Sequence, residues 1–218
     1  MGPAYAGGLG LRRGMNVVMV HGFGDTGRLF RRMSRTLEER GHACLAPTMS
    51  PADARLGIED LSVKLASLVD GEVPAGAPMA MVGFSMGALV VRHYLQALGG
   101  ARRTRAFFSI AGPHGGTMNA YLYPGRGTRE MRPGSAFLRG LAKGTANLGG
   151  LPAFAYRTPF DLMVTPSTSC RMAGAEEVVV WCPFHSLMPG NTRVMGHIAG
   201  TLAAIEASAT GAGPAGAA

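Results

Sequence analysis

The sequence predicts an α/β protein in which a mainly parallel sheet is covered by helices on both faces. Short apolar runs alternate with longer stretches of helical periodicity, and this alternation implies right-handed crossovers between parallel strands. A strand buried on both faces forms an uninterrupted apolar run, as in residues 15–20 and 78–84. Ligands of such sheets bind beyond the carboxyl ends of the strands, so the residues that follow each strand are candidates for a site.

Amphipathic helices are expected between the first strands. Apolar residues recur at helical spacing over residues 28–40, where Gly41 stops the pattern, and again over residues 55–69. Residues 42–47 form a short apolar run that we expect to be the strand between these two helices.

The rest of the chain continues the alternation. The expected elements are a helix over 88–98, a strand over 105–111, a short helix over 135–142, a strand over 178–181 and a closing helix over 192–207. Periodicity weakens over residues 115–157, where we expect a cap or a substrate-facing loop.

Length and composition fit one globular domain. A chain of 218 residues can build one α/β core, and no stretch resembles an interdomain linker. We expect an N-terminal arm over residues 1–14, a single domain over 15–207 and a flexible tail over 208–218. The first residues lack the apolar segment of a signal peptide, and no run approaches the ~18 residues of a membrane span. We therefore expect a cytoplasmic protein without stable membrane insertion.

The charged residues, histidines and cysteines point to no cofactor. The net charge of +8 could attract nucleic acid, but the arginines of residues 28–35 recur at helical spacing without interleaved aromatics. We interpret them as a solvated helix face and expect no nucleic-acid partner. No ligand set for a metal, phosphate loop or dinucleotide fingerprint is present, so we expect neither metal nor cofactor. Cys44, Cys170 and Cys182 suggest a reducing compartment, with a Cys170–Cys182 bridge left open.

The pentapeptide Gly83-Phe-Ser-Met-Gly87 lies between an expected strand and an expected helix. We interpret it as a nucleophile elbow, because such a strained turn crowds its neighbours and admits only glycine two residues to either side of the serine. Ser85 would then lie at a helix N-terminus, where the helix dipole and free N–H groups favour developing negative charge. Ser85 is the candidate nucleophile.

A serine hydroxyl requires a base and an orienting acid, and the chain supplies both in the order serine, acid, histidine. Asp161 is the candidate acid, and we expect an apolar strand to begin at its carboxylate. His185 follows the strand expected at 178–181 and is the candidate base. His197 is its rival, but it falls within the closing helix.

The remaining acidic and histidine candidates are assigned structural roles. They are Glu176 and Glu177 as turn residues, Asp25 as a residue that fixes its loop, and His21, His42, His93 and His114 as packing or loop residues.

The loop after the first strand, His21-Gly-Phe-Gly-Asp25, is expected to complete the site. Two N–H donors must face the oxyanion, and the candidates are the backbone amides of Phe23 and Met86. His21, Gly22, Gly83 and Gly87 are expected to support these donors and the nucleophile.

Five segments together resemble the small bacterial lipases and esterases of the α/β-hydrolase fold, over roughly residues 15–207. They are His21-Gly-Phe-Gly-Asp25, Gly83-Phe-Ser-Met-Gly87, Gly112-Pro-His-Gly-Gly-Thr117, Met131-Arg-Pro-Gly-Ser-Ala-Phe-Leu138 and Thr158-Pro-Phe-Asp-Leu-Met-Val164. The resemblance implies an α/β-hydrolase fold with a small lid or none, the triad Ser85, Asp161 and His185, and an oxyanion hole at Phe23 and Met86.

The function expected from these residues is hydrolysis of a carboxylic ester or lipid through an acyl-enzyme. Alternatives are an acyltransferase on the same triad and a non-catalytic binding protein with this fold. The sequence does not fix acyl chain length. Six apolar residues could form an acyl site or simply cover the core: Tyr121, Leu122, Tyr123, Phe137, Leu138 and Leu141.

Overall fold

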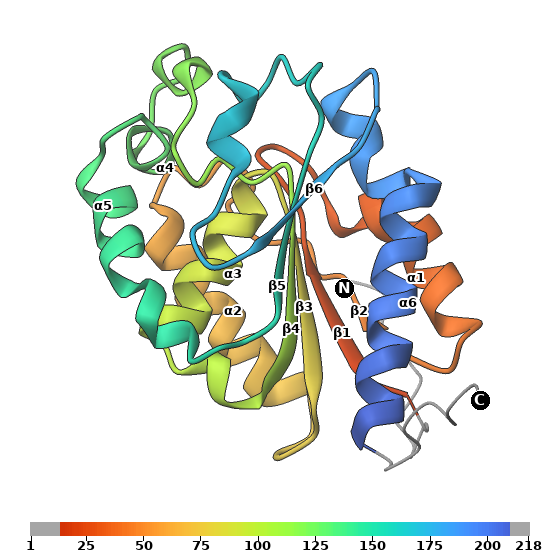
Figure 1. Cartoon of the computed structure of the whole chain (residues 1–218). Coiled ribbons are helices and arrows are strands. Elements are labelled where there is room, and N and C mark those ends of the chain that lie inside the picture. Colours follow the sequence, from red (N-terminus) through yellow and green to blue (C-terminus); the bar gives the residue numbers. More distant parts are fainter. Residues whose placement is uncertain (1–13, 210–218) are drawn as a thin grey trace.

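The computed structural model describes residues 14–209. In this range six strands form one sheet in the order β2-β1-β3-β4-β5-β6, and every neighbouring pair is parallel (Figure 1). The strands are β1 (Asn16–Val20), β2 (Ala43–Leu45), β3 (Met79–Phe84), β4 (Thr104–Ile110), β5 (Ala153–Arg157) and β6 (Glu176–Val179). The parallel sheet predicted from the sequence is confirmed.

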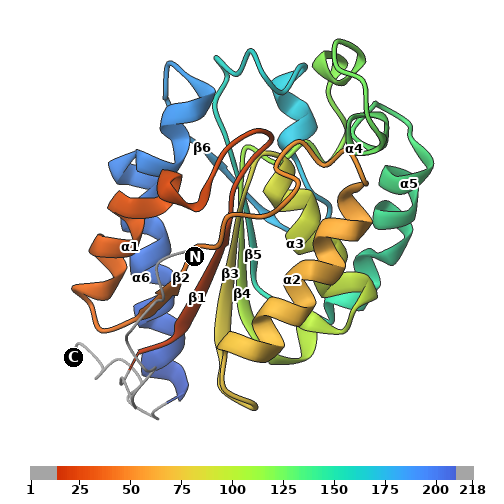
Figure 2. The same ribbon diagram turned by 180° about the vertical axis from the view of Figure 1, so that it is seen from behind.

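Helices cover both faces of the sheet (Figures 1 and 2). They are α1 (Arg31–Glu38), α2 (Ile58–Glu72), α3 (Met86–Ala97), α4 (Arg126–Glu130), α5 (Ala136–Lys143) and α6 (Thr192–Ala209). Helices α1 and α6 lie on one face, while α2 and α3 lie on the other with α4 and α5 beside them. Each face buries its own apolar layer, so the central strands β1, β3 and β4 are apolar on both sides.

The first two helices begin differently from the prediction. The helix expected at residue 28 opens with a 3₁₀ turn, Gly27–Phe30, and continues as α1. The helix expected at residue 55 begins at Ile58, because Gly57 has a φ of 109° and the Ile58 N–H donates to the Glu130 carboxylate at 2.6 Å.

The prediction of a strand beginning at Asp161 is wrong. The chain leaves the sheet at the end of β5, and residues 158–166 form turns and bends. Asp161 Oδ1 accepts the backbone N–H groups of Met163 at 2.9 Å and Val164 at 2.8 Å, which closes a turn around the carboxylate. The strand β5 lies just before this turn, in a segment whose apolar pattern was too weak to predict it.

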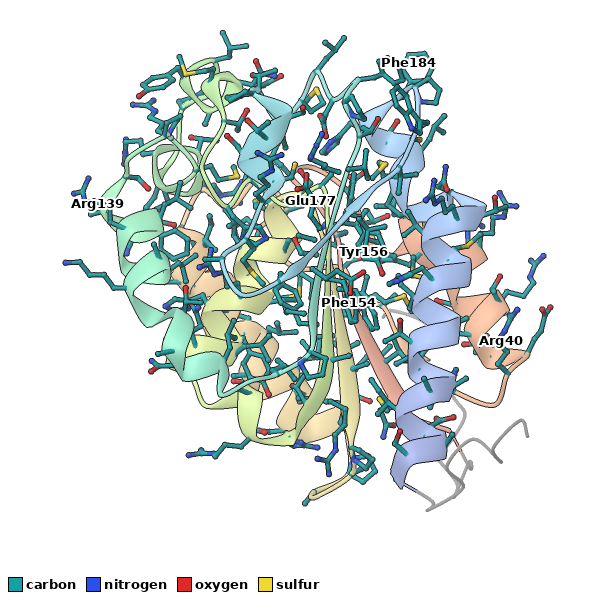
Figure 3. The ribbon with its side chains drawn as sticks, viewed as in Figure 1. Arg40, Arg139, Phe154, Tyr156, Glu177 and Phe184 are labelled. Atoms are coloured by element: carbon teal, nitrogen blue, oxygen red, sulfur yellow. The ribbon has the colours of Figure 1, made fainter. Side chains whose placement is uncertain are left out.

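The assignment of Glu176 and Glu177 to a turn is also wrong. Both residues belong to β6, on the edge of the sheet. Glu177 pairs with Arg157 of the neighbouring strand and with Arg171 (Figure 3 labels Glu177). Both residues are exposed although they belong to a strand, and a sequence pattern cannot distinguish such an exposed edge strand from a loop.

The segment expected to form a cap connects β4 to β5. It holds α4, α5 and short 3₁₀ turns packed beside α2 and α3, in keeping with a fold that has a small lid or none. Helix α6 runs to Ala209, two residues into the expected tail, and the arm over residues 1–13 and the remainder of the tail lie outside the described range. None of the helices in residues 14–209 is long and apolar enough to cross a membrane.

Cys170 and Cys182 are both free thiols, so the bridge between them that the sequence left open does not form. Cys170 and Cys182 are buried, and burial raises the pKa of the Cys170 thiol above its ordinary range, with the Asp161 carboxylate as a second cause. Cys170 is therefore an unreactive thiol that packs in the core.

Candidate active site

Ser85 is the single residue between β3 and α3. It has φ 53° and ψ −125°, a backbone conformation that costs a non-glycine residue free energy and is retained where the surroundings enforce it. The Ser85 N–H donates to Ile110 O at the end of β4, at 2.8 Å, which ties the turn to the sheet. The serine is half-buried at the carboxyl edge of the central strands.

Glycine is required on both sides of this turn. A Cβ on Gly83 would overlap the backbone of Ala88, and a Cβ on Gly87 would overlap the carbonyl oxygen of Val20. The start of α3 therefore lies directly against the ends of β1 and β3. This close approach places Ser85 beside the loop that follows β1.

Asp161 and His185 form a hydrogen-bonded pair at the same edge. His185 Nδ1 lies 2.8 Å from Asp161 Oδ2, and the side chains are 10% and 0% exposed. Since Oδ1 already accepts two backbone N–H groups, the carboxylate is held as an acceptor and His185 carries its proton on Nδ1. The Nε2 lone pair of His185 is then available as a base. The Phe84 ring, 4.8 Å from the imidazole ring, supports it.

Two cavities meet at Ser85. The large cavity, about 470 Å³, is lined by Ser85 and His185 together with Phe160, Leu162 and Phe184. The small cavity, about 60 Å³, is lined by Ser85 but not by His185. Phe23, Tyr123 and Met163 border both.

The structure thus brings Ser85, Asp161 and His185 to one edge of the sheet. No hydrogen bond joins the side chains of Ser85 and His185 within residues 14–209. Such contacts are often long in unliganded enzymes and shorten when substrate binds.

Phe23 and Met86, the two candidates for the oxyanion hole, both belong to backbone segments next to Ser85. Met86 is the first residue of α3, and a Cβ on Gly22 would lie 3.0 Å from Ser85 Cβ, so the Phe23 loop passes directly against Ser85. Neither N–H donates to an acceptor in the part of the chain that the structure describes. Two free donors beside a serine are the arrangement that an oxyanion requires.

His21 fixes the loop that carries Phe23. The fully buried ring accepts the Met49 N–H on Nε2 at 2.8 Å and lies 2.8 Å from Gly22 O through Nδ1, so it bridges two loops. The Gly24 N–H donates to Ala52 O at 2.9 Å. These contacts replace the one expected of Asp25, whose carboxylate forms no hydrogen bond among residues 14–209 and lines the large cavity instead.

The other histidines have structural partners or positions. His197 Nδ1 lies 2.8 Å from the hydroxyl of Tyr156, and its ring contacts the edge of Phe154; Figure 3 shows both aromatics on β5, toward α6. His42 accepts the Met15 N–H at 3.1 Å, and the His93 ring packs at a tilt against Phe137, with the ring centroids 5.6 Å apart.

A buried network that sequence reasoning missed lies beneath the loop after β4. His114 Nε2 is 2.7 Å from Ser109 Oγ, and its Nδ1 is 3.3 Å from the guanidinium of Arg92. Arg92 also donates to Leu141 O and Thr145 Oγ1, at 3.0 and 3.1 Å. The network joins α3 and α5 to the loop that borders the small cavity. In the sequence, Arg92, Ser109 and His114 are isolated polar residues in separate segments, and no local pattern connects them.

This network predicts a dependence of stability on pH. Burial, and then the Arg92 cation, lower the pKa of His114 well below its ordinary value. As the pH falls, the unfolded chain therefore takes up this proton before the folded protein does. The contribution of neutral His114 to stability is fully present above the unfolded pKa of about 6.5 and is lost as the pH falls below it. The pKa values of His42 and His93 are also lowered, chiefly by burial.

Below pH 6.5 we expect the melting temperature to fall by up to about 3–5 °C per pH unit for each such group. Calorimetry of the wild type and of His114→Asn from pH 8 to pH 5 measures this. The variant should melt lower at pH 8 but lose less stability toward pH 5. Parallel curves for the two proteins would show that His114 is not a source of acid sensitivity.

The residues that border the cavities were only partly predictable. Of the six apolar candidates, Tyr123 borders both cavities. Phe137 and Leu141 line a separate cavity of about 580 Å³ beside α3 and α5, away from Ser85. Phe160, Leu162, Met163 and Phe184 were not singled out, although each lies within three residues of a predicted triad member.

Comparison with known proteins identifies the family. The sequence profile of the alpha/beta hydrolase family matches residues 17–209, which is most of the chain, and the chain therefore belongs to that family. The resemblance inferred from the five sequence segments is confirmed at this level. No curated protein matches the chain by sequence.

Solved structures with the same fold include two lipases and a further hydrolase. Lipase B of Aspergillus fumigatus has a TM-score of 0.76 and 15% identity, and the alignment covers 92% of this chain and 55% of the lipase chain. The mature lipase BlEst2 of Bacillus licheniformis has a TM-score of 0.70 and 12% identity, and the alignment covers 87% of this chain and 92% of the BlEst2 chain. A pyrethroid hydrolase of Sphingobium faniae JZ-2 has a TM-score of 0.61 and 16% identity, covering 87% and 98%. At these identities the similarity concerns the fold alone.

Proposed function

We propose that the protein is a serine carboxylic-ester hydrolase that works through an acyl-enzyme. The observation that carries this proposal is the 2.8 Å hydrogen bond between His185 Nδ1 and the buried carboxylate of Asp161, beside a cavity that Ser85 also lines. Family membership supports it, and two of the structurally similar proteins are themselves named as lipases.

The proposed reaction begins with attack on the ester carbonyl. Ser85 Oγ bonds to the carbonyl carbon while its proton passes to His185 Nε2, and Asp161 stabilises the imidazolium that forms. The carbonyl oxygen becomes an oxyanion, which the N–H groups of Phe23 and Met86 stabilise. His185 then gives the proton to the departing alcohol oxygen as the carbon–oxygen bond breaks, which leaves an acyl-Ser85.

Hydrolysis of the acyl-enzyme repeats these steps with water. His185 removes a proton from the water as its oxygen attacks the acyl carbon, and Ser85 Oγ recovers that proton when the acid departs. One ester and one water give one acid and one alcohol.

A pair of histidine variants tests the proposal. His185→Gln should lower kcat for 4-nitrophenyl butanoate by about 10⁴-fold or more, because the serine loses its base. His197→Gln is the matched control, since His197 contacts Tyr156 in the core and should leave kcat within a few fold. The rate is followed as nitrophenol release. A His185→Gln protein that is folded and keeps most of its kcat would rule the mechanism out.

A further inference from the structure

We propose that the two cavities at Ser85 divide the ester between them, with the acyl group in the small cavity and the alcohol in the large one. The preferred substrates are then esters of short uncharged acids with bulky apolar alcohols. This inference rests on the proposed function and specifies its substrate class. It follows from the position of His185 and from the size and lining of each cavity.

The position of His185 decides which cavity holds the alcohol. The departing alcohol oxygen must receive its proton from His185 Nε2, so the alcohol lies on the His185 side of Ser85. His185 lines the large cavity and not the small one. The acyl group, which becomes bonded to Ser85 Oγ, is then left with the small cavity, which Ser85 lines and His185 does not.

The size of the small cavity limits the acyl chain. A water needs about 10–15 Å³ of such volume, so 60 Å³ holds about four groups of the size of a water or a methylene. Four of its lining residues, Ala120, Thr128, Met131 and Val164, are buried, with exposures of 6% or less, so this inner part of the wall cannot easily widen. An acyl chain of up to about four or five carbons fits, and a decanoyl chain does not.

The lining of the small cavity favours an uncharged acyl group. None of the residues between 14 and 209 that border it has a charged side chain. Its polar side chains are turned to backbone carbonyls: Thr128 Oγ1 donates to Tyr123 O at 3.0 Å, Thr117 Oγ1 to Met163 O at 2.9 Å, and Asn119 Nδ2 to Leu162 O at 2.6 Å. A carboxylate or ammonium on the acyl group would be desolvated there without a partner.

The large cavity suits a bulky apolar alcohol. Its volume of about 470 Å³ is within the range that binds drug-sized molecules. Phe160, Leu162 and Phe184 border it and are 50%, 78% and 62% exposed, so apolar surface is available to an incoming group. Figure 3 shows Phe184 at the outer end of the molecule, above the sheet. The Phe160 ring packs 5.5 Å from Trp181, which extends this surface.

The first test varies each half of the ester on the wild-type protein. One series runs from 4-nitrophenyl acetate through butanoate and hexanoate to decanoate. A second compares ethyl with 3-phenylpropyl butanoate by titration of released acid, since these two alcohols leave with similar intrinsic ease. We expect kcat/KM to fall about 10-fold or more from butanoate to decanoate, and to rise about 10-fold or more from the ethyl to the 3-phenylpropyl ester.

Cavity variants test the assignment itself, through ratios of kcat/KM that do not depend on the amount of folded protein. Met131→Ala lengthens the small cavity and should raise the hexanoate-to-butanoate ratio about 10-fold. Ala120→Val narrows it and should lower the butanoate-to-acetate ratio. Phe184→Ala, on the large cavity, should lower the 3-phenylpropyl-to-ethyl ratio and leave the acyl ratios unchanged.

The outcomes separate this inference from the proposed function. A wild-type preference that rises toward decanoate, or a Phe184→Ala variant that changes the acyl ratios, would place the acyl chain in the large cavity and overturn the assignment while leaving the hydrolase intact. Absence of turnover on every ester, with Ser85 unreactive toward a fluorophosphonate, would overturn the proposed function and this inference with it.

Discussion

Replacement of Ser85 by alanine should lower kcat/KM for 4-nitrophenyl butanoate by about 10⁴–10⁶-fold, so that hydrolysis is little faster than the uncatalysed reaction in buffer. The reason is that the proposed acyl-enzyme cannot form without the hydroxyl, whatever else remains in the site. Ser85 is half-buried and its hydroxyl makes no hydrogen bond among residues 14–209, so removing it should cost little stability. The measurement is initial rate against ester concentration.

The control for this variant is Ser67→Ala, on the exposed face of α2, where the hydroxyl donates to Val63 O. It should retain the wild-type rate. A melting temperature of Ser85→Ala within a few degrees of the wild type would show that any loss is chemical. A folded Ser85→Ala protein with more than about a tenth of the wild-type kcat/KM would contradict the assignment of the nucleophile.

The second large effect is expected for Asp161→Asn, which should lower kcat by about 10⁴-fold. The substituted side chain keeps an oxygen for the N–H groups of Met163 and Val164. Its NH₂ then faces His185 Nδ1, which forces the imidazole proton onto Nε2 and removes the base. The loss should appear in kcat rather than KM, because ester binding does not involve this carboxylate.

Asp60→Asn serves as the matched control, because Asp60 pairs with Lys64 on the surface of α2, away from the cavities at Ser85. It should change kcat by less than about twofold. The ¹⁵N chemical shifts of the His185 ring report the tautomer directly. If Asp161→Asn kept Nδ1 protonated and kept kcat within tenfold of the wild type, Asp161 would not be the orienting acid.

The sequence predicted the parts of the fold that have strong local signals. The buried strands β1, β3 and β4 are continuous apolar runs, and the glycines around Ser85 mark a turn with no room for side chains. These signals are local, because burial on both faces and backbone crowding act within a few residues. The parallel sheet and its layers of helices followed from them.

The rest depended on contacts between distant segments. The strand β5 follows a weakly patterned connection, and its pairing with β4 and β6 identifies it. Asp161 was expected to begin a strand, but its carboxylate accepts the backbone N–H groups of Met163 and Val164 and closes a turn instead. The Arg92–His114–Ser109 network joins residues that are up to 22 positions apart.

The substrate-facing surface shows the same limit. Tyr123 and Met163 border both cavities, but they reach Ser85 from two separate loops. The sequence shows that each loop is apolar. It does not show how the two loops are placed relative to each other, and this placement forms the small and the large cavity. That placement is set by the packing of the β4–β5 connection against the Asp161 turn, through Thr117 and Asn119.

Covalent labelling with a fluorophosphonate tests the central claim most directly, because only a serine with an assembled base and oxyanion hole reacts at an appreciable rate. The purified wild-type protein, Ser85→Ala and His185→Gln are treated in parallel, and the adduct is located by peptide mass spectrometry. We expect one adduct per chain on Ser85 in the wild type and none in either variant. A folded wild-type protein without an adduct on Ser85 would contradict the account and favour a non-catalytic binding role for this fold.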